Sequence, residues 1–578
     1  MASPQKEKAH WLDRYATGYH AWHCTTNEHG QTTFKRPLGL VETSFDTDGA
    51  YYGGRADMTG TLTCEVQHSL SKEHLRRRIA LAWAALRLRH VLLMSRHVDD
   101  DDDDDDASGL RHFAIDVPST LAEAVRDVEH SIVWVEDYYP SVDARELHEH
   151  ALNVGRVVEP RSCMAKLHVL PLRRLPAGSW ELSLLVVMAH QISDGLSAYG
   201  WFQDLIRLLN QSERGVEAEI AASLRLQVLR ERLPPAQEDL YPSIVGNRAR
   251  QRWIWAIIRV LRHVKHTLPP TFANPLYRAT RLAKPRPLAQ TYAKVFVYEG
   301  ATMPPMSTGH VTATLSATAS ARLISLCRDA QLSIGAGCFA LAGLAMMHIH
   351  SSRYPMLSPA DMPAMTASFP LNPRAFFANP PPADSCMLAF SDGIVMPFLP
   401  SSLPVEKRFR LAARTANREL RAYQKRLKTT EQGEISAGLD KHSPARLLAT
   451  GYLAQIERVE SKLPPHRQLG FGNPQGELKA SGGLGATCGV SSVGSLKGYF
   501  RAGEYDLNDK TKDLVVDYRG LRMGVRARDG EFLVGSSTDF EGRVGFGVSY
   551  DMNAIDPEAA DMWARTIAGL LEKKESKL

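Results

Sequence analysis

Apolar runs and helix-periodic segments alternate along this chain, most clearly around E-L-S-L-L-V-V-M-A-H-Q-I-S-D-G. The apolar run that ends at Ala189 predicts a buried strand. The next residues, L-S-A-Y-G-W-F-Q-D-L-I-R-L-L-N, have helical spacing and predict a helix over 196–210. His190 and Asp194 therefore fall on a strand-to-helix turn, where Gly195 gives the backbone room.

An earlier segment shows the same order of strand and helix. Residues 55–66 mix polar and apolar positions as a strand does, and Ser71 is a helix-capping residue directly before a periodic stretch. Four apolar residues of that stretch share one face: Leu75, Ile79, Ala82 and Leu86. We expect this helix to pack on a sheet.

The second part of the chain repeats the architecture without repeating the sequence. A strand is predicted over 310–316, an apolar helical stretch over 334–347, and a final helix begins after its capping residue Asp556. At 578 residues the chain is also too long for one comfortable core. We predict an α/β protein in three parts: an N-terminal half (1–230), an irregular connection (231–305) and a C-terminal half (306–578).

The connection contains R-W-I-W-A-I-I-R-V-L-R-H-V-K-H, which is basic and aromatic at helical spacing. It fits either a packed connecting helix, which we favour, or a helix on a membrane surface. The N-terminus lacks an apolar leader, and we find no run of the roughly 18 apolar residues that a membrane span needs. We therefore expect a cytoplasmic protein without a transmembrane segment. The eight aspartates from Asp99 to Asp106 indicate a solvated loop.

Composition narrows the class further. The chain is 44% hydrophobic and 23% charged, and its net charge of +5 is small for its length, so nothing calls for a nucleic-acid partner. Its seven cysteines form an odd set without a C-x-x-C pair, which argues against a disulfide scaffold and a zinc knuckle. We expect reduced, structural cysteines and no metal site.

Three interpretations of His190 compete. A neutral imidazole at a rigid strand end suits a general base, but a histidine can also be buried for packing alone. His190 and Asp194 are spaced for metal ligation, yet a third ligand is lacking. Asp194 needs a partner such as arginine if it is charged and buried, so we assign it a structural role. The chain lacks G-x-S-x-G, a P-loop and a dinucleotide fingerprint.

Several blocks carry a resemblance to a known group of enzymes. H-Q-I-S-D-G after an apolar strand resembles the acyltransferase superfamily of chloramphenicol acetyltransferase, the plant BAHD enzymes and peptide-synthetase condensation domains. The similarity is closest to fungal trichothecene 15-O-acetyltransferases and extends over these blocks: R-P-L-G-L-V-E (36–42), Y-Y-G-G-R-A-D-M (51–58), N-P-R (372–374), F-S-D-G-I-V-M-P-F-L-P (390–400) and D-F-E-G-R-V-G-F-G-V-S-Y (539–550).

The resemblance implies two chloramphenicol-acetyltransferase-like domains, each a mixed β-sheet flanked by helices, with a tunnel along their interface. It implies that His190 is the general base and that Asp194 orients the turn, with Arg374 as its hypothetical partner. The implied substrates are an acyl-CoA, acetyl-CoA first of all, and a small-molecule alcohol such as a trichothecene-type sesquiterpenoid, with the hydroxyl at C-15 as a candidate acceptor. We expect a monomer without a bound cofactor.

Two departures from the family patterns bear on these expectations. The plant enzymes carry D-F-G-W-G where this chain has D-F-E-G-R-V-G-F-G, and Ala189 stands where condensation domains have a second histidine. The second departure favours free acyl-CoA over a carrier-protein thioester. A condensation-type enzyme and a non-catalytic binding protein of the same fold remain the alternatives. An oxyanion would need a donor, for which Ser491 and Ser492 are candidates.

Overall fold

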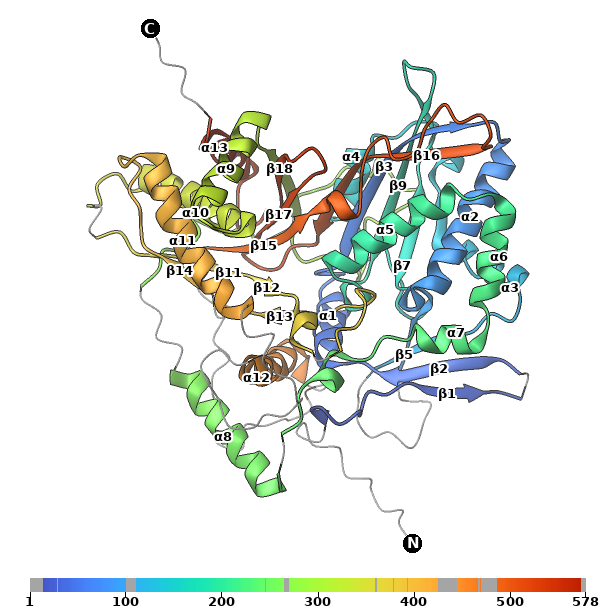
Figure 1. Cartoon of the computed structure of the whole chain (residues 1–578), viewed down its shortest axis with the longest axis horizontal. Coiled ribbons are helices and arrows are strands. Elements are labelled where there is room, and N and C mark those ends of the chain that lie inside the picture. The colour runs from blue at the N-terminus through green and yellow to red at the C-terminus, as the bar shows by residue number, and fades with distance from the viewer. Residues whose placement is uncertain are drawn as a thin grey trace.

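Two large mixed sheets lie side by side in the computed structural model, each with helices packed against it (Figure 1). The structure describes residues 14–28, 30–99, 111–244, 246–264, 270–358, 361–377, 379–391, 393–424, 444–465, 468 and 486–572. Most of the predicted aspartate run, 100–106, lies outside these residues.

The first sheet is six-stranded, with the order β16-β3-β9-β7-β6 and β8 paired to β9. Its strands are β3 (Met58–His68), β6 (Ile132–Trp134), β7 (Ala165–Val169), β8 (Arg173–Arg174), β9 (Trp180–Met188) and β16 (Leu514–Val525). The helices of this part of the chain are α2 (Lys72–Arg89), α3 (Leu121–Arg126), α4 (Ala144–Ala151), α5 (Gly195–Leu209), α6 (Glu213–Ser223) and α7 (Leu226–Glu231). Because β16 comes from the C-terminal part of the chain, strands from both parts share one sheet.

The register of this sheet shows which strand ends lie next to one another. Met58 pairs with Met188 at the end of β9 and with Val525 at the end of β16. β9 and β16 both run antiparallel to β3, so their C-terminal ends lie at the same end of the sheet. The residues that follow β9 and those that follow β16 therefore lie close together, although they are far apart in the sequence.

The second sheet has six strands in the order β10-β18-β17-β15-β11-β14. These are β10 (Thr308–Thr314), β11 (Met365–Ser368), β14 (Ile394–Met396), β15 (Cys488–Ser495), β17 (Phe532–Thr538) and β18 (Val544–Asp551). The helices beside it are α9 (Ala317–Asp329), α10 (Ile334–Arg353), α11 (Val405–Gln424) and α13 (Pro557–Gly569). Pairs β11·β15 and β15·β17 are parallel and the others antiparallel, so the sheet is mixed.

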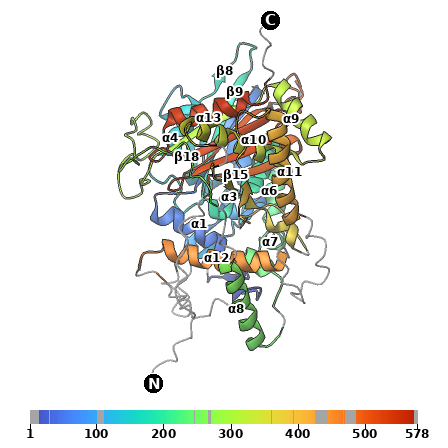
Figure 2. The same cartoon turned by 90° about the vertical axis from the view of Figure 1, so that its left-hand side faces the viewer.

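Smaller elements complete the structure below these sheets. The third sheet has the order β1-β2-β5-β4, from β1 (His23–Thr26), β2 (Thr32–Pro37), β4 (Arg96–Val98) and β5 (His112–Asp116), and a two-stranded ribbon joins β12 (Pro370–Leu371) to β13 (Ala389–Phe390). Helix α12 (Pro444–Lys462) crosses beneath α1 (Leu40–Tyr51), and α8 (Arg248–Val264) lies under α12 (Figure 2).

Local predictions hold where the periodic pattern is strong. Ser71 caps α2 through a hydrogen bond from the His74 amide, and the four residues of the predicted apolar face are buried. Asp556 likewise caps α13. The predicted connecting helix is α8, which buries Trp255 in a cluster with residues of α12. The division at residues 230 and 305 stays a prediction.

Helix α10 modifies the expectation about membrane spans. It is 20 residues long and apolar enough to pass a test of length and composition, with 78% of the tested window buried inside the protein. Such burial is that of a core helix. All seven cysteines are free, and only Cys24 among them is exposed.

Candidate active site

His190 lies directly beyond the end of β9, in the short 3-10 turn His190–Ile192 that leads into α5. The Ala189 amide donates to the Met164 carbonyl at 2.9 Å, which holds the start of the turn against a neighbouring segment. The residue as a whole is half-buried. The end of a strand thus positions the imidazole.

The imidazole packs against an aromatic ring from α1. His190 and Phe45 stack with ring centroids 3.9 Å apart and planes 5° from parallel. On another side, Cys386 Sγ lies 3.8 Å from His190 Nδ1. Phe45 and Cys386 belong to a small apolar cluster that is separate from the cores of the two sheets. The ring is therefore held by groups from both parts of the chain.

These surroundings keep the imidazole neutral. Burial lowers the pKa of His190 to about 4, and the positive charge of Arg528 adds to the effect. Main-chain hydrogen bonds at His190 and Ser193 and the nearby Asp194 carboxylate oppose this shift without cancelling it. At neutral pH the ring therefore has a free lone pair for a proton.

Asp194 is fully engaged in fixing the turn. Its Oδ1 accepts hydrogen bonds from the amides of Leu196 and Ser197, both at 3.0 Å, and so caps α5. Its Oδ2 accepts from Arg374 Nη1 at 2.7 Å and from the Met387 amide at 3.2 Å. The structure thus brings Asp194 and Arg374 together as a buried ion pair.

Arg374 connects this pair to the second half of the chain. It lies in the 3-10 turn Pro373–Phe376, and its Nη2 donates to the Ser385 carbonyl at 2.6 Å. The cysteine that contacts His190 follows directly after Ser385. One arginine therefore links the turn that carries His190 to the loop that flanks the imidazole.

Gly195 has no steric need to be glycine in this structure. It is the first residue of α5, its φ lies outside the left-handed region, and a Cβ there would meet no atom within 4 Å. The predicted turn is present, but its backbone does not require glycine. The space beside Gly195 at the start of α5 is open, and glycine leaves it unfilled.

Ser491 and Ser492 lie on β15 of the second sheet. The Ser491 carbonyl accepts a hydrogen bond from Ser536 Oγ at 3.3 Å, and Ser492 is exposed. None of the contacts among the described residues joins either serine to His190. The structure therefore does not gather these serines with the imidazole in the way it gathers Asp194 and Arg374.

A charged cluster lies beyond Phe45 and was not anticipated from the sequence. Arg528 places its guanidinium carbon 5.4 Å from the Phe45 ring centroid and donates to Asp48 Oδ2 from Nε at 3.1 Å. Asp48 also accepts from Lys462 Nζ at 2.7 Å and from Arg55 Nη2 at 2.7 Å. Burial would raise the pKa of Asp48, but these three cations hold it below its ordinary value.

The sequence holds only weak signals for these added residues. Phe45 and Asp48 lie in E-T-S-F-D-T-D-G, where five polar residues on a short helix are buried: Glu42, Ser44, Asp46, Thr47 and Asp48. Polar residues that are repeatedly buried need partners. Which partners they have depends on pairing between distant strands, which the pattern does not reveal.

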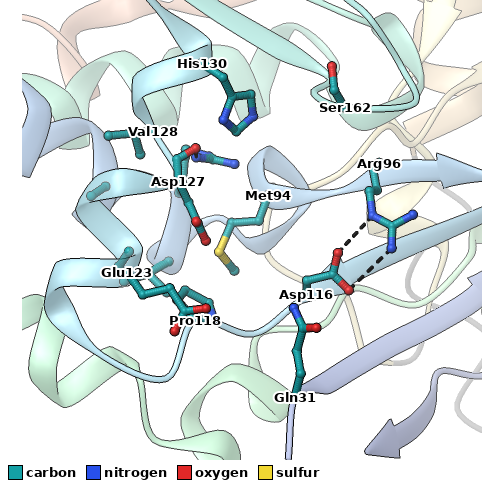
Figure 3. Close-up of a pocket in the computed structure, with 14 residues that line it drawn as sticks. Gln31, Met94, Arg96, Asp116, Pro118, Glu123, Asp127, Val128, His130 and Ser162 are labelled. Carbon is teal, nitrogen blue, oxygen red and sulfur yellow. Dashed lines mark hydrogen bonds and ion pairs between the residues drawn. The ribbon is translucent and has the colours of Figure 1, made fainter. Parts of the chain in front are cut away.

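A separate cavity of about 230 Å³ lies beneath α2, away from His190. Residues of the third sheet and of the segment 118–130 line it, including Asp127 and His130 (Figure 3). At its rim the Arg96 guanidinium is paired with the Asp116 carboxylate at 2.8 Å. Residues of the N-terminal half line this cavity, so it is not the tunnel expected between the two halves, which stays a prediction.

Comparisons with known proteins place the fold. No protein-family model matches the chain, and no curated protein matches it in sequence. Its structure is similar to TRI3 trichothecene 15-O-acetyltransferase from Fusarium sporotrichioides, with a TM-score of 0.63 and 12% identity over 99% of each chain. It is also similar to the holo four-domain nonribosomal peptide synthetase AB3403, with a TM-score of 0.50 and 11% identity over 95% of this chain and 33% of that one.

At such identities the likeness establishes the fold. The chain has the two-domain fold of the chloramphenicol-acetyltransferase-like and condensation-domain acyltransferases, each domain a mixed sheet flanked by helices. The predicted fold class is confirmed.

Proposed function

We propose that the protein is an acyl-CoA-dependent O-acyltransferase with His190 as its general base. The observation that carries the proposal is the neutral imidazole of the half-buried His190, which lies at a strand end in contact with Phe45 and Cys386. A group in this state accepts a proton from an alcohol without first having to lose one. The fold shared with TRI3 trichothecene 15-O-acetyltransferase supports the same reaction class.

In the proposed reaction the acceptor hydroxyl bonds to His190 Nε2, because Nδ1 lies toward Cys386. The hydroxyl oxygen attacks the thioester carbonyl of the acyl-CoA as its proton passes to the imidazole. The resulting oxyanion collapses, the C–S bond breaks, and the imidazolium returns its proton to the CoA thiolate. The products are an ester and free CoA, and no acyl-enzyme forms.

Asp194 serves this step as a positioning residue. Its carboxylate is occupied by two amides of α5, Arg374 and a further amide, so it has no free oxygen for substrate. Its effect is to hold the turn from which the imidazole projects. Ser491 and Ser492 remain proposed donors to the oxyanion. Either serine would contact it only if β15 moves toward His190 or if the bound substrate extends to the serine.

For the substrates, we propose acetyl-CoA as the donor and a sesquiterpenoid alcohol of the trichothecene type, with C-15 as the hydroxyl to test first. The basis is the structural similarity to TRI3 together with the motif blocks in the sequence. We propose a cytoplasmic monomer, divided near residues 230 and 305. A carrier-protein thioester is the competing donor, in keeping with the similarity to AB3403.

The proposal is tested by incubating the protein with a donor panel and hydroxylated sesquiterpenoids. Release of free thiol and gain of an acyl mass on the acceptor are expected with acetyl-CoA. Transfer only from an acyl group on a carrier protein would replace this proposal with the condensation-type alternative. Binding of the acceptors without any transfer would favour a non-catalytic protein of this fold.

A further inference from the structure

Three cations contact one buried carboxylate, Asp48, and a fourth lies near them, in a cluster that touches Phe45 through Arg528. Asp48 has no solvent exposure, and Arg55, Lys462 and Arg528 use both of its oxygens. The side chains of Arg528 and Lys462 keep 27% and 15% exposure. The carboxylate is therefore buried, while the side chains of Arg528 and Lys462 that bind it remain partly exposed to solvent.

Arg458 is the fourth cation, which Asp48 and Glu531 attract only from beyond ion-pair distance. Its guanidinium carbon lies 4.7 Å from the Phe390 ring centroid, and among the described residues no carboxylate comes within ion-pair distance of it. Burial lowers its pKa, and repulsion from Arg528 adds to this. A half-buried guanidinium without an acid is costly. An anion from outside the chain would relieve that cost.

The whole group carries an excess of positive charge. The buried and half-buried members are Arg55, Arg458, Lys462 and Arg528 against Asp48 and Glu531. Asp529 is 67% exposed and shared with Arg281, so it adds little at the rim. Burial lowers the pKa of Lys462 to about 7, which agrees with a site short of negative charge.

Distance from His190 decides which anion could fit. Arg528 lies over the Phe45 ring, 5.4 Å from its centroid, and His190 stacks on the same ring, so the cation and the base both contact one aromatic side chain. In an acyl-CoA the long pantetheine arm separates the thioester from the nearest phosphate. A CoA phosphate therefore cannot reach this cluster while the thioester lies at His190, unless the arm folds back. An acidic acceptor can span the short gap.

We propose that the Arg458, Lys462 and Arg528 cluster binds a carboxylate on the acceptor, so that the substrate is a hydroxy acid whose hydroxyl lies at His190. This inference rests on the proposed function and specifies its acceptor. Guanidinium groups suit carboxylates because they donate two parallel hydrogen bonds. Within the terpenoid alcohols, it singles out those that carry a carboxyl group about one ring away from the hydroxyl.

The test uses trans-4-hydroxycyclohexanecarboxylate, in which one ring separates the two groups, and its methyl ester. Calorimetric titration of the full-length protein without acetyl-CoA is expected to show the acid binding at least about tenfold more tightly than the ester. Arg458→Gln and, separately, Lys462→Met should remove that preference. Arg414→Gln, at an exposed position of α11, is the matched control and should retain it.

Equal binding of acid and ester by the wild-type protein, or no binding of the acid at millimolar concentration, would overturn the inference even if acyl transfer is found. A preference for the acid with no acyl transfer would sink the proposed function and leave the anion site standing. A phosphate of CoA is the other anion that the cluster could bind. Comparing the binding of acetyl-CoA with that of acetyl-pantetheine, which lacks phosphates, distinguishes it from a carboxylate of the acceptor. If Arg458→Gln weakens only acetyl-CoA, the cluster serves CoA phosphate and the inference fails.

Discussion

Arg374 Nη1 lies 2.7 Å from Asp194 Oδ2, joining residues 180 positions apart in the sequence. Asp194 caps the helix that follows the His190 turn, and Arg374 belongs to the part of the chain that brings Cys386 to the imidazole. The pair is almost fully buried, with side-chain exposures of 6% for Arg374 and 5% for Asp194. It therefore fixes the two parts of the site relative to each other.

Replacing Asp194 with asparagine should destabilise the protein by about 3–5 kcal/mol, because the buried Arg374 guanidinium loses its carboxylate partner. Activity should fall along with soluble yield. Urea unfolding measures the loss. The control is Glu149→Gln, which breaks an exposed i,i+4 pair with Arg145 and should cost less than about 0.5 kcal/mol. A fall in rate with unchanged stability would contradict the structural role of Asp194.

Cys386 tests whether an acyl-enzyme is involved. Burial raises the pKa of its thiol well above the ordinary value, so it stays protonated at neutral pH and is a poor nucleophile. Cys386→Ala should therefore retain at least about a tenth of wild-type turnover. Iodoacetamide should label the exposed Cys24 first, as peptide mass spectrometry would show. An acetylated Cys386 trapped from acetyl-CoA would refute direct transfer.

Phe45 should matter for rate more than for stability. Phe45→Leu keeps most of the volume and should cost less than about 1.5 kcal/mol, but it removes the ring that holds the imidazole plane. We expect kcat/KM to fall about tenfold or more, since loss of orientation alone has such effects. The control is Phe546→Leu in the second core, which should leave kcat/KM unchanged. Equal kinetics in both variants would dismiss the stacking argument.

Acid should destabilise the fold through buried histidines. Burial lowers the pKa of each of five: His97, His148, His168, His190 and His310. The unfolded chain takes up protons below about pH 6.5, while the folded protein resists until about pH 4. The unfolded state therefore binds more protons between these values, so the free energy of unfolding falls as pH falls from 6.5 toward 4.

Above pH 6.5 these histidines are neutral in both states and contribute no pH dependence. Within the window, each contributes a slope of up to about 1.4 kcal/mol per pH unit. Denaturant unfolding at several pH values between 7 and 5 measures the sum. A free energy of unfolding that stays constant or rises toward pH 5 would contradict the prediction, because it would mean that the imidazole rings of these histidines are hydrated in the folded protein.

The local part of the site follows from the sequence, and the assembled part does not. The apolar run before His190 and the periodic stretch after it predict β9, the turn and α5, because each signal lies within a few residues. Asp194 could be assigned a structural role because a buried carboxylate needs a partner. Arg374 was inferred from the family resemblance, and no periodicity points to it.

Phe45 and Arg528 could not have been inferred from periodicity. Phe45 reaches His190 through the packing of α1 on the His190 turn, and Arg528 through the pairing of β16 with β3, which brings a strand from near the C-terminus to the end of the sheet where β9 ends. Pairing between strands so far apart is decided by the whole fold. For the same reason the sequence does not point to Arg458, because its charge gains meaning only when Arg528 and Lys462 are known to be its neighbours.

The central claim is that the His190 imidazole takes the proton from the acceptor alcohol. The most direct measurement compares thiol release from acetyl-CoA by the wild type, by His190→Ala and by the control His23→Ala at an exposed position, with folding checked by circular dichroism. The account predicts a loss of at least about a hundredfold in kcat for the folded His190→Ala protein alone. Near-normal turnover by that folded variant would contradict it.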